Sequence, residues 1–359
     1  MGIIRRRLLL SDEGGLLPKG QWLSAPQYTA FESWPIYTFM SADGNHAGVI
    51  TGYNGSNMSM YSYDFNSAVN SEYPVYANRH KYVSDAGNFK ISRIGDNLIW
   101  ANTYSSITNT ISSYLQQSIG TTNISTTYNN ASYVPILVDD GYLYTMRSTS
   151  YRYRTQNLTS FTSQTTYYCP SGSLLYTYGG NGHAFFINTA AKLSQYNMTA
   201  NSTTQLTCTY LPSASLMFNR YKQGLLYDGN YYFPFSSDSA SGILKYDNST
   251  FSVFYDDTET GISSSSVASA GALCLVGNYM AYASFNTNGQ LAIKFLDLSN
   301  GTEISREIVM TTTYSNNRIY NVTSLALDIN TGRGVTGYYI WTPASSAYYD
   351  WGILARKTS

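Results

Sequence analysis

Histidine could supply metal or acid–base chemistry, and this chain has three histidines. His46, His80 and His183 stand at unrelated places, without the HxxxH, HExxH or HxH spacing that would hold zinc. His46 and His183 occupy similar turn positions, where a histidine with a satisfied hydrogen bond is commoner than a metal ligand. We therefore predict no metal centre.

The cysteines offer no better basis for a cofactor or a covalent catalyst. Cys169, Cys208 and Cys274 are odd in number and widely spaced, without a CxxC pair for a metal or a disulfide framework. Free cysteine is among the most buried residue types, so we expect three buried thiols. There is also no GxSxG, Walker or dinucleotide-binding motif in a suitable context. We predict that no cofactor is bound.

Paired carboxylates could cleave glycosides if two of them met across a central depression. The candidates are Asp139, Asp140, Asp256, Asp257 and Asp350. The first four stand beside predicted turns, where aspartate is expected for its own turn chemistry. The sequence therefore favours a protein that is not an enzyme, with a polysaccharide-degrading enzyme as an alternative.

The run Asp328-Ile-Asn330-Thr-Gly332 matches the first half of a calcium loop. The distal bidentate glutamate is missing, and the same run is an ordinary hairpin connection. We expect a turn here, with calcium bound by Asp328 and Asn330 as the alternative.

One short run predicts ligand binding. In Tyr151-Arg152-Tyr153-Arg154, strand alternation places both tyrosines on one face and both arginines on the other. Aromatic faces and arginine forks engage glycan and protein surfaces, so these four residues are the candidate ligand-binding site. The alternative is an outer strand with a packed tyrosine face and a solvated arginine face.

The composition predicts short strands joined by tight turns. Tyrosine supplies 36 residues and glycine 28, and tyrosine favours strands whereas glycine favours turns. Charged residues make up 12%, about half the usual share. Lysine plus arginine equals aspartate plus glutamate at 21 each, so no net basic field attracts phosphates or an anionic membrane. We expect neither nucleic acid nor a membrane as a partner.

A two-part unit recurs along the chain. Its first part is a turn closed by Asp-Gly or Gly-Asn, followed by an apolar strand. Such strands begin near Ala47, Leu98, Tyr142, Ala184, Tyr231 and Tyr279. The second part is a strand that ends in Asp or Asn, as at Asp64, Asn197, Asp247 and Asp297. We expect this side chain to cap the turn that follows.

The second part resembles the Tyr-Asp strand end of kelch-like blades, and repeats of about 39 to 50 residues suit four-stranded blades. The resemblance implies an all-β chain with a single β-propeller of about seven four-stranded blades over residues 34–359. Each of the six strands above should then lie in a separate blade. Six blades, or tandem β-sandwiches, are the alternatives.

Residues 1–33 stand outside the repeats and form a predicted N-terminal arm. The apolar run near its start is too short for a signal peptide, so we expect no secretory export. Aliphatic side chains there would be costly to leave in water, at roughly 1.5–3 kcal/mol each, so the arm should dock. The predicted partner-binding residues are Ile3, Ile4, Arg5, Arg6, Arg7, Leu8, Leu9 and Leu10. We expect strand addition to a neighbouring protein, with completion of a blade of its own ring as the alternative.

The composition, β-rich, cysteine-poor and rich in aromatic and hydroxyl groups, resembles that of bacteriophage virion proteins such as tail or head appendages. The resemblance implies a structural or adhesion protein that is made in the host cytoplasm and located in the virion. Its expected partners are other virion proteins and a host surface glycan or protein. A lectin-like, carbohydrate-binding propeller is a further alternative. Repeated pockets at equivalent blade positions would favour glycan binding, whereas carboxylates converging at one end of the axis would favour the enzyme.

Overall fold

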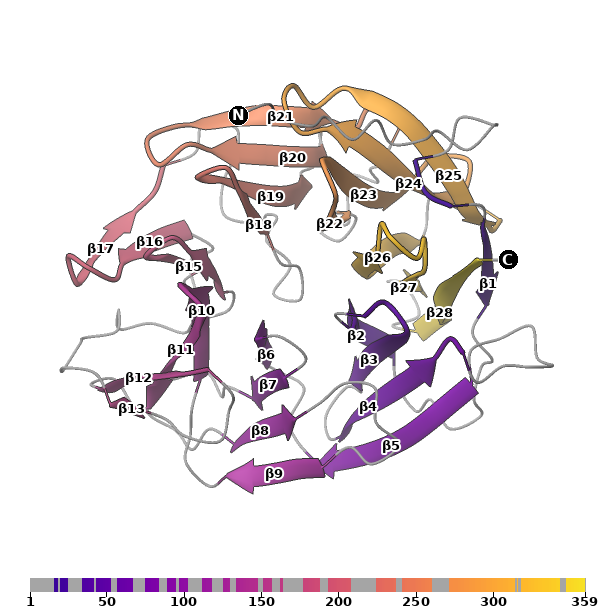
Figure 1. Cartoon of the computed structure of the whole chain (residues 1–359). Helices are drawn as coiled ribbons and strands as arrows, with labels where there is room; N and C mark the ends of the chain where they lie inside the picture. Colours follow the sequence, from indigo (N-terminus) through magenta and orange to yellow (C-terminus); the bar gives the residue numbers. More distant parts are fainter. Residues whose placement is uncertain are drawn as a thin grey trace, which may run out of the picture.

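The computed structural model of the chain is a ring of antiparallel sheets around a central axis (Figure 1). Its strands form seven sheets of four strands, and each sheet runs outward from an innermost strand. The predicted seven-bladed propeller is confirmed, and the six-blade and sandwich alternatives are wrong. The structure describes residues 16–18, 20–24, 34–41, 43–52, 57–66, 75–83, 89–94, 97–102, 112–117, 125–129, 134–147, 151–156, 162–163, 177–187, 193–207, 224–236, 241–259, 271–313, 315, 318–342 and 347–358.

The first four blades follow the chain in order, each from its innermost to its outermost strand. Blade 1 contains β2 (Trp34–Met40), β3 (His46–Gly52), β4 (Asn57–Asp64) and β5 (Val75–Val83). Blade 2 contains β6 (Phe89–Ile94), β7 (Asn97–Asn102), β8 (Ser112–Gln117) and β9 (Ser125–Asn129). Blade 3 contains β10 (Val134–Asp139), β11 (Tyr142–Arg147), β12 (Tyr151–Thr155) and β13 (Thr162–Ser163). Blade 4 contains β14 (Thr177–Gly180), β15 (His183–Ile187), β16 (Leu193–Asn197) and β17 (Ser202–Gln205).

Blades 5 and 6 keep this order, whereas blade 7 takes its outermost strand from the start of the chain. Blade 5 contains β18 (Leu225–Tyr227), β19 (Asn230–Ser236), β20 (Ser241–Tyr246) and β21 (Phe251–Asp256). Blade 6 contains β22 (Ala272–Val276), β23 (Tyr279–Phe285), β24 (Gln290–Asp297) and β25 (Glu303–Thr311). Blade 7 contains β26 (Ile319–Leu327), β27 (Gly334–Thr342), β28 (Ala347–Thr358) and β1 (Gly20–Ser24).

The second strands of blades 1 to 6 are the six strands that the sequence predicted, and each lies in a separate sheet. Their turns close as expected. In Asp140–Gly141, Asn181–Gly182 and Asp228–Gly229, both residues have φ between 46° and 74°. Positive φ at both central positions is what a two-residue hairpin turn of type I′ requires. The local sequence therefore fixes the hairpin that starts each of these three blades.

Residues near the start of the chain close the ring. β1 pairs antiparallel with β28, so strands from the two ends of the described chain complete blade 7. Trp22 on β1 donates its indole N–H to Glu307 on β25, at 2.9 Å, and Leu17 is buried in the core between blades 6 and 7. Of the segment 1–33 that we expected outside the ring, residues 20–24 thus lie within its last blade. Residues 3–10 lie outside the described part of the chain.

The core lies between neighbouring blades, because a single sheet has two faces to bury. One buried cluster joins blade 4 to blade 5, another joins blade 5 to blade 6, and others join blade 7 to blades 6 and 1. Between blades 4 and 5, Phe185 contacts the rings of Tyr231, Phe233 and Tyr246 at centroid distances of 4.5–5.9 Å.

The meander topology places the first-to-second connection of every blade, and the third-to-fourth connections of blades 1 to 6, on one face of the ring, here called the turn face. The remaining connections lie on the opposite face. No helix in the described residues is long and apolar enough to span a bilayer.

Candidate functional site

The acids considered for catalysis are distributed over three blades. Asp139 and Asp140 lie at the first turn of blade 3, Asp256 is the last residue of the outermost strand of blade 5 and Asp257 follows it, and Asp350 lies on β28 of blade 7. Asp350 accepts a hydrogen bond from the Tyr338 hydroxyl, at 3.3 Å. Burial, with a contribution from Asp350, raises the pKa of Tyr338 above its usual range.

Two of these acids are engaged between blades. The carboxylate of Asp139 accepts the backbone N–H groups of Asn181 and Gly182, so it caps the first turn of the next blade. Asp257 is buried, and its carboxylate pairs with Lys294 and accepts the Ser284 hydroxyl at 2.7 Å. Both carboxylates therefore stabilise blade junctions, and neither lines the central cavity described below.

The described histidines occupy turns or strands. The ring of His183 contacts the carbonyl oxygen of Asn181 at 2.9 Å and the side chain of Asn197 at 3.2 Å. This matches the predicted turn histidine with hydrogen-bonded nitrogens. His46 begins β3, 3.8 Å from Asp43, and His80 lies on β5. Within the described residues, no group of three His, Cys, Asp or Glu side chains is placed to hold a metal ion.

The half calcium motif forms a capped turn. The Asp328 carboxylate accepts the backbone N–H groups of Asn330 and Thr331, at 2.7 and 2.9 Å. Its other oxygen faces Gly44 in the first turn of blade 1, where an added Cβ would lie only 2.7 Å away. Asp328 therefore caps its own turn, whereas Asp139 caps the turn of the next blade, and Asp328 also lies beside the first turn of blade 1.

The third-strand ends behave as the repeat predicts. Asn197, Asp247 and Asp297 each accept backbone N–H groups from the turn that follows, at 2.7–3.0 Å. The hydrogen bond that Thr250 donates lowers the pKa of Asp247, and the hydrogen bond that the Ser299 hydroxyl donates lowers the pKa of Asp297. The expected capping role is confirmed at these three positions.

These turns create a repeated polar surface on the turn face of blades 4, 5 and 6. Its exposed hydroxyl and amide side chains include Thr199, Asn248, Ser249, Ser299, Asn300 and Thr302. Asn248 donates to the carbonyl oxygen of Gly229 within blade 5 and accepts a hydrogen bond from Gln195 of blade 4, at 3.5 Å, which links the two blades. It is a rigid row of uncharged hydrogen-bonding groups around capped acids.

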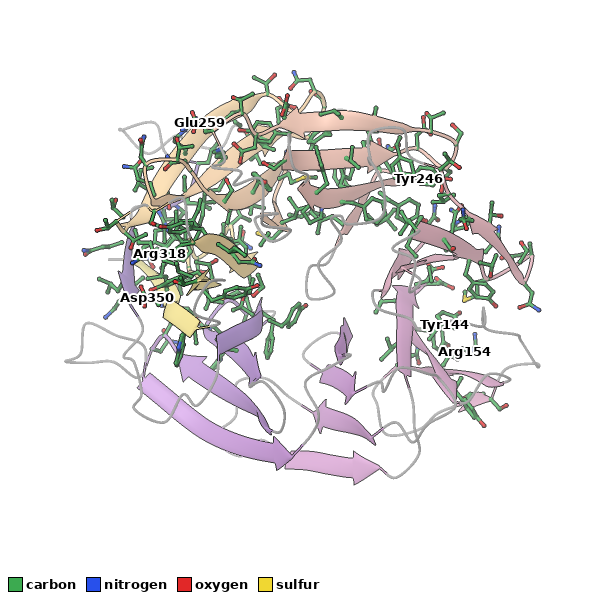
Figure 2. The ribbon with its side chains drawn as sticks, turned by 180° about the vertical axis from the view of Figure 1, so that it is seen from behind. Tyr144, Arg154, Tyr246, Glu259, Arg318 and Asp350 are labelled. Carbon is green, nitrogen blue, oxygen red and sulfur yellow. The ribbon has the colours of Figure 1, made fainter. Side chains whose placement is uncertain are left out.

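The run from Tyr151 to Arg154 forms β12, the third strand of blade 3. The guanidinium of Arg154 lies 4.4 Å from the ring centroid of Tyr142, and Tyr144 lies opposite Arg154 in the register (Figure 2). On the arginine face, the half-buried Arg154 therefore packs against Tyr142 of the neighbouring strand β11, and ligand binding by this run stays a prediction. Tyr153 is half-buried. Tyr151 and Arg152 lie on the strand, but their side chains are outside the description.

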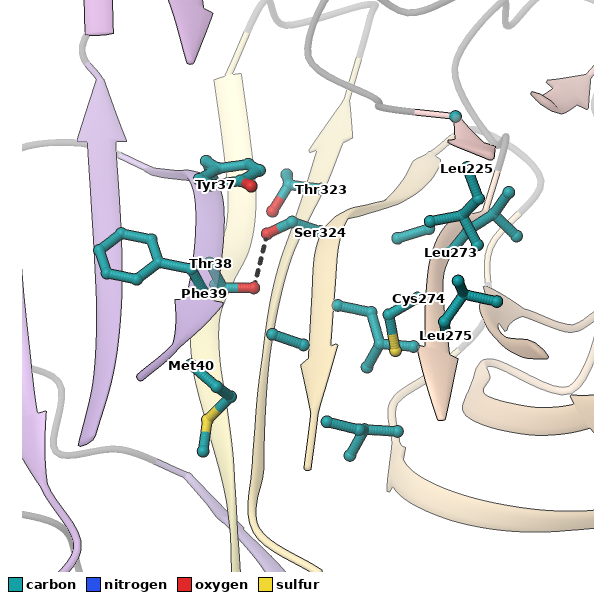
Figure 3. A pocket seen from close by; sticks show the side chains of 15 residues that line it. Tyr37, Thr38, Phe39, Met40, Leu225, Leu273, Cys274, Leu275, Thr323 and Ser324 are labelled. Atoms are coloured by element: carbon teal, nitrogen blue, oxygen red, sulfur yellow. Dashed lines mark hydrogen bonds between the residues drawn. The ribbon is translucent and has the colours of Figure 1, made fainter. Parts of the chain in front are cut away.

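A cavity of about 250 Å³ lies at the centre of the ring, among the innermost strands of blades 5, 6, 7 and 1. Figure 3 shows Tyr37 and Thr38 on one side of it and Leu225 and Leu273 on the other. Cys274 also lines it, and burial raises the pKa of this thiol to about 12. The other two cysteines lie outside the described residues. No sequence signal pointed to this cavity, because its lining residues come from four separate strands.

Comparison with known proteins addresses the fold. A scan against family models and a search of curated proteins both found no match. The chain is similar to the solved WD40 repeats of RRP9, with a TM-score of 0.55 and 8% identity, covering 96% of this chain and 99% of that chain. It is also similar to the structure of U3-55K, with a TM-score of 0.56 and 8% identity, covering 94% and 98%. The chain therefore has the β-propeller fold of WD40 repeat proteins along nearly its whole length.

Proposed function

We propose that this chain is a non-enzymatic binding protein that uses its turn face to hold a partner, as a structural or adhesion component of a virion. The observation that carries the proposal is the repeated polar surface on blades 4, 5 and 6. Capped turns at equivalent blade positions offer hydroxyl and amide groups in a fixed geometry. Rigid groups of this kind lose little conformational freedom on binding, which favours affinity for glycans and polar protein surfaces.

The carboxylates support the same proposal. A glycoside-cleaving pair would place two carboxyl groups roughly 5–9.5 Å apart at one sugar site. Asp139 and Asp257 instead belong to junctions of different blades and are engaged by backbone amides or by Lys294. An acid already held in this way is a poor proton donor or nucleophile.

The virion part of the proposal depends on the composition and on the arm. The low charged fraction of 12% and the 36 tyrosines favour a phage structural protein. The proposed relationship to kelch-like propellers is supported only by the third strands that end in Asp or Asn. In this proposal, residues 3–10 attach the propeller to another virion protein.

The binding proposal is tested on an immobilised glycan panel and on host cell surfaces. Lysines at two exposed turn positions, Thr199→Lys with Thr302→Lys, should weaken binding at least tenfold, or about 1.4 kcal/mol, by filling the surface with long charged side chains. Val253→Lys on the outermost strand β21, where Val253 is 41% exposed, is the matched control and should leave binding unchanged. Release of reducing ends from a polysaccharide, lost in Asp139→Asn or Asp350→Asn, would overturn the proposal in favour of the enzyme.

The attachment proposal is tested by deleting residues 1–15. The cut stops before Leu16 because Leu17 is buried and β1 closes the ring. The shortened protein should keep its melting temperature but disappear from purified particles in quantitative mass spectrometry. Normal incorporation of the shortened protein would contradict the attachment role.

A further inference from the structure

The central cavity has the features of a binding site that is independent of the turn face. It lies among β2, β18, β22 and β26, and none of the described residues that line it carries a formal charge. More of its surface is apolar than polar, and Leu225, Leu273 and Leu275 lie on one side. A charged group there would lose part of its hydration without gaining an ion partner, so the site favours an uncharged ligand.

The hydroxyl groups beside the cavity are largely satisfied by one another. Ser324 donates to the Thr38 hydroxyl at 2.9 Å, as Figure 3 shows, and Thr38 contacts the carbonyl oxygen of Val335 at 3.5 Å. Thr336 donates to the carbonyl oxygen of Ser324 at 2.8 Å. The bonds of Thr38 join blade 7 to blade 1 and leave the hydroxyls of Thr38 and Ser324 occupied.

Thr323 differs from these neighbours. It lines the cavity, its side chain is 3% exposed, and its hydroxyl oxygen has no hydrogen-bond partner. It is the extra residue of a β-bulge, because the register of β26 with β27 shifts between Val322 and Ser324. Bulges redirect a side chain and are common beside binding sites. Since buried polar groups are nearly always bonded, an unbonded hydroxyl in a cavity calls for a partner.

We propose that the cavity binds a small uncharged molecule with an aliphatic or aromatic body and one hydroxyl or carbonyl group, which bonds to the Thr323 hydroxyl. The size is suitable, because a cavity of about 150 Å³ already accepts benzene. Water is a weaker candidate, since a buried water needs about two to four polar partners and the adjacent hydroxyls of Thr38 and Ser324 are already bonded.

Three aromatic probes of similar shape test the proposal by calorimetry and ligand-observed NMR. Benzyl alcohol carries the required hydroxyl, toluene lacks it, and benzylamine adds a charge. Benzyl alcohol should bind about fivefold more tightly than toluene, the factor expected for one hydrogen bond. Benzylamine should not bind, and Ala326→Phe, which fills the cavity, should abolish binding of all three.

The role of the hydroxyl is tested at position 323 itself. Thr323→Val should reduce the affinity for benzyl alcohol to that for toluene and leave toluene binding unchanged, which also shows that the cavity is intact. Thr323→Ser should restore the preference. An equal preference in wild type and Thr323→Val, no binding of either neutral probe, or a crystal soaked in benzyl alcohol with water alone beside Thr323 would each overturn the proposal. The turn-face variants Thr199→Lys and Thr302→Lys should bind the probes normally, so this site and the proposed function can fail separately.

Discussion

Two junctions of the ring are built from different chemistry. Between blades 5 and 6, Asp257 and Lys294 form a buried ion pair, with side chains 0% and 1% exposed. Near the axis between blades 7 and 1, a buried hydrogen bond joins the neutral hydroxyls of Thr38 and Ser324. The same kind of sheet-on-sheet contact is therefore stabilised by charge in one place and by small hydroxyl groups in the other.

Distance from the axis explains the difference. Thr38 and Ser324 lie on the innermost strands β2 and β26, whereas Lys294 lies on the third strand of its blade and Asp257 follows a fourth strand. Because blades radiate from the axis, neighbouring sheets diverge outward (Figure 1). Small side chains fit where the sheets are close, and long side chains such as lysine and tyrosine fill the wider space. Tyr255, for example, has its ring centroid 5.7 Å from the Lys294 nitrogen.

The largest effect is expected at the charged junction. Lys294→Met removes the buried partner of Asp257 and should lower the free energy of unfolding by about 3–5 kcal/mol, because an unpaired buried carboxylate is left behind. Urea unfolding monitored by tryptophan fluorescence measures the change. Lys245→Met on β20, a half-buried lysine of blade 5, should change stability by no more than about 0.5 kcal/mol.

The double variant Lys294→Met with Asp257→Leu sharpens this test. With both charges gone, most of the loss should be recovered, since a buried pair replaced by apolar groups is often neutral. A double variant as unstable as Lys294→Met would show that packing, and not the uncompensated charge, governs this junction.

The junction of blades 7 and 1 also contains Arg333, a half-buried residue in the first turn of blade 7. It donates to Asn45 at 2.8 Å and to Asn66 at 3.0 Å, and its guanidinium lies 5.5 Å from the Phe65 ring centroid. Arg333→Ala should lower the free energy of unfolding by roughly 1–2 kcal/mol. Arg333→Lys keeps the charge but loses the branched set of guanidinium donors, so its free energy of unfolding should lie between those of wild type and Arg333→Ala. A loss in Arg333→Ala equal to that in Lys294→Met would contradict the comparison.

A smaller effect is expected for the inner hydroxyls. Ser324→Ala removes the hydroxyl that donates to Thr38. It should lower the free energy of unfolding by about 1 kcal/mol, the usual net value of a neutral hydrogen bond. Thr38→Val should cost a similar amount, and the double variant should cost less than the sum because the two hydroxyls share one bond. Additive losses would mean that the bond contributes little.

The smallest effect concerns acid. Hydrogen bonds from the Ser41 hydroxyl and the Asn45 backbone N–H lower the pKa of Asp43, in the first turn of blade 1, from 3.8 to about 2. A lowered folded-state pKa stabilises the protein above pH 3.8, and this contribution is lost as the pH falls toward 2. Because Asp43 is exposed, the contribution should be only a few tenths of a kcal/mol. Wild type should therefore exceed Asp43→Asn in stability at pH 6 and match it near pH 2, as thermal unfolding at both pH values can check.

The sequence by itself determined the features that depend on near neighbours. Asp-Gly and Asn-Gly turns require positive φ, and strand-ending residues such as Asp247 accept N–H groups only two or three positions away. These signals are complete within a few residues, so they located the second strands, the capped turns and the number of blades. They also indicated that aspartate at a turn has a structural use.

Only the tertiary structure decided which distant residues meet. Lys294 pairs with a carboxylate 37 positions away, Ser324 with a hydroxyl 286 positions away, and Trp22 with a glutamate 285 positions away. Likewise, the half-buried Arg154 packs against Tyr142 of a neighbouring strand, and the bulge at Thr323 leaves a hydroxyl without a partner among the described residues beside a central cavity. Such contacts depend on how whole sheets stack around the axis, and no short-range pattern in the chain encodes the space left between them.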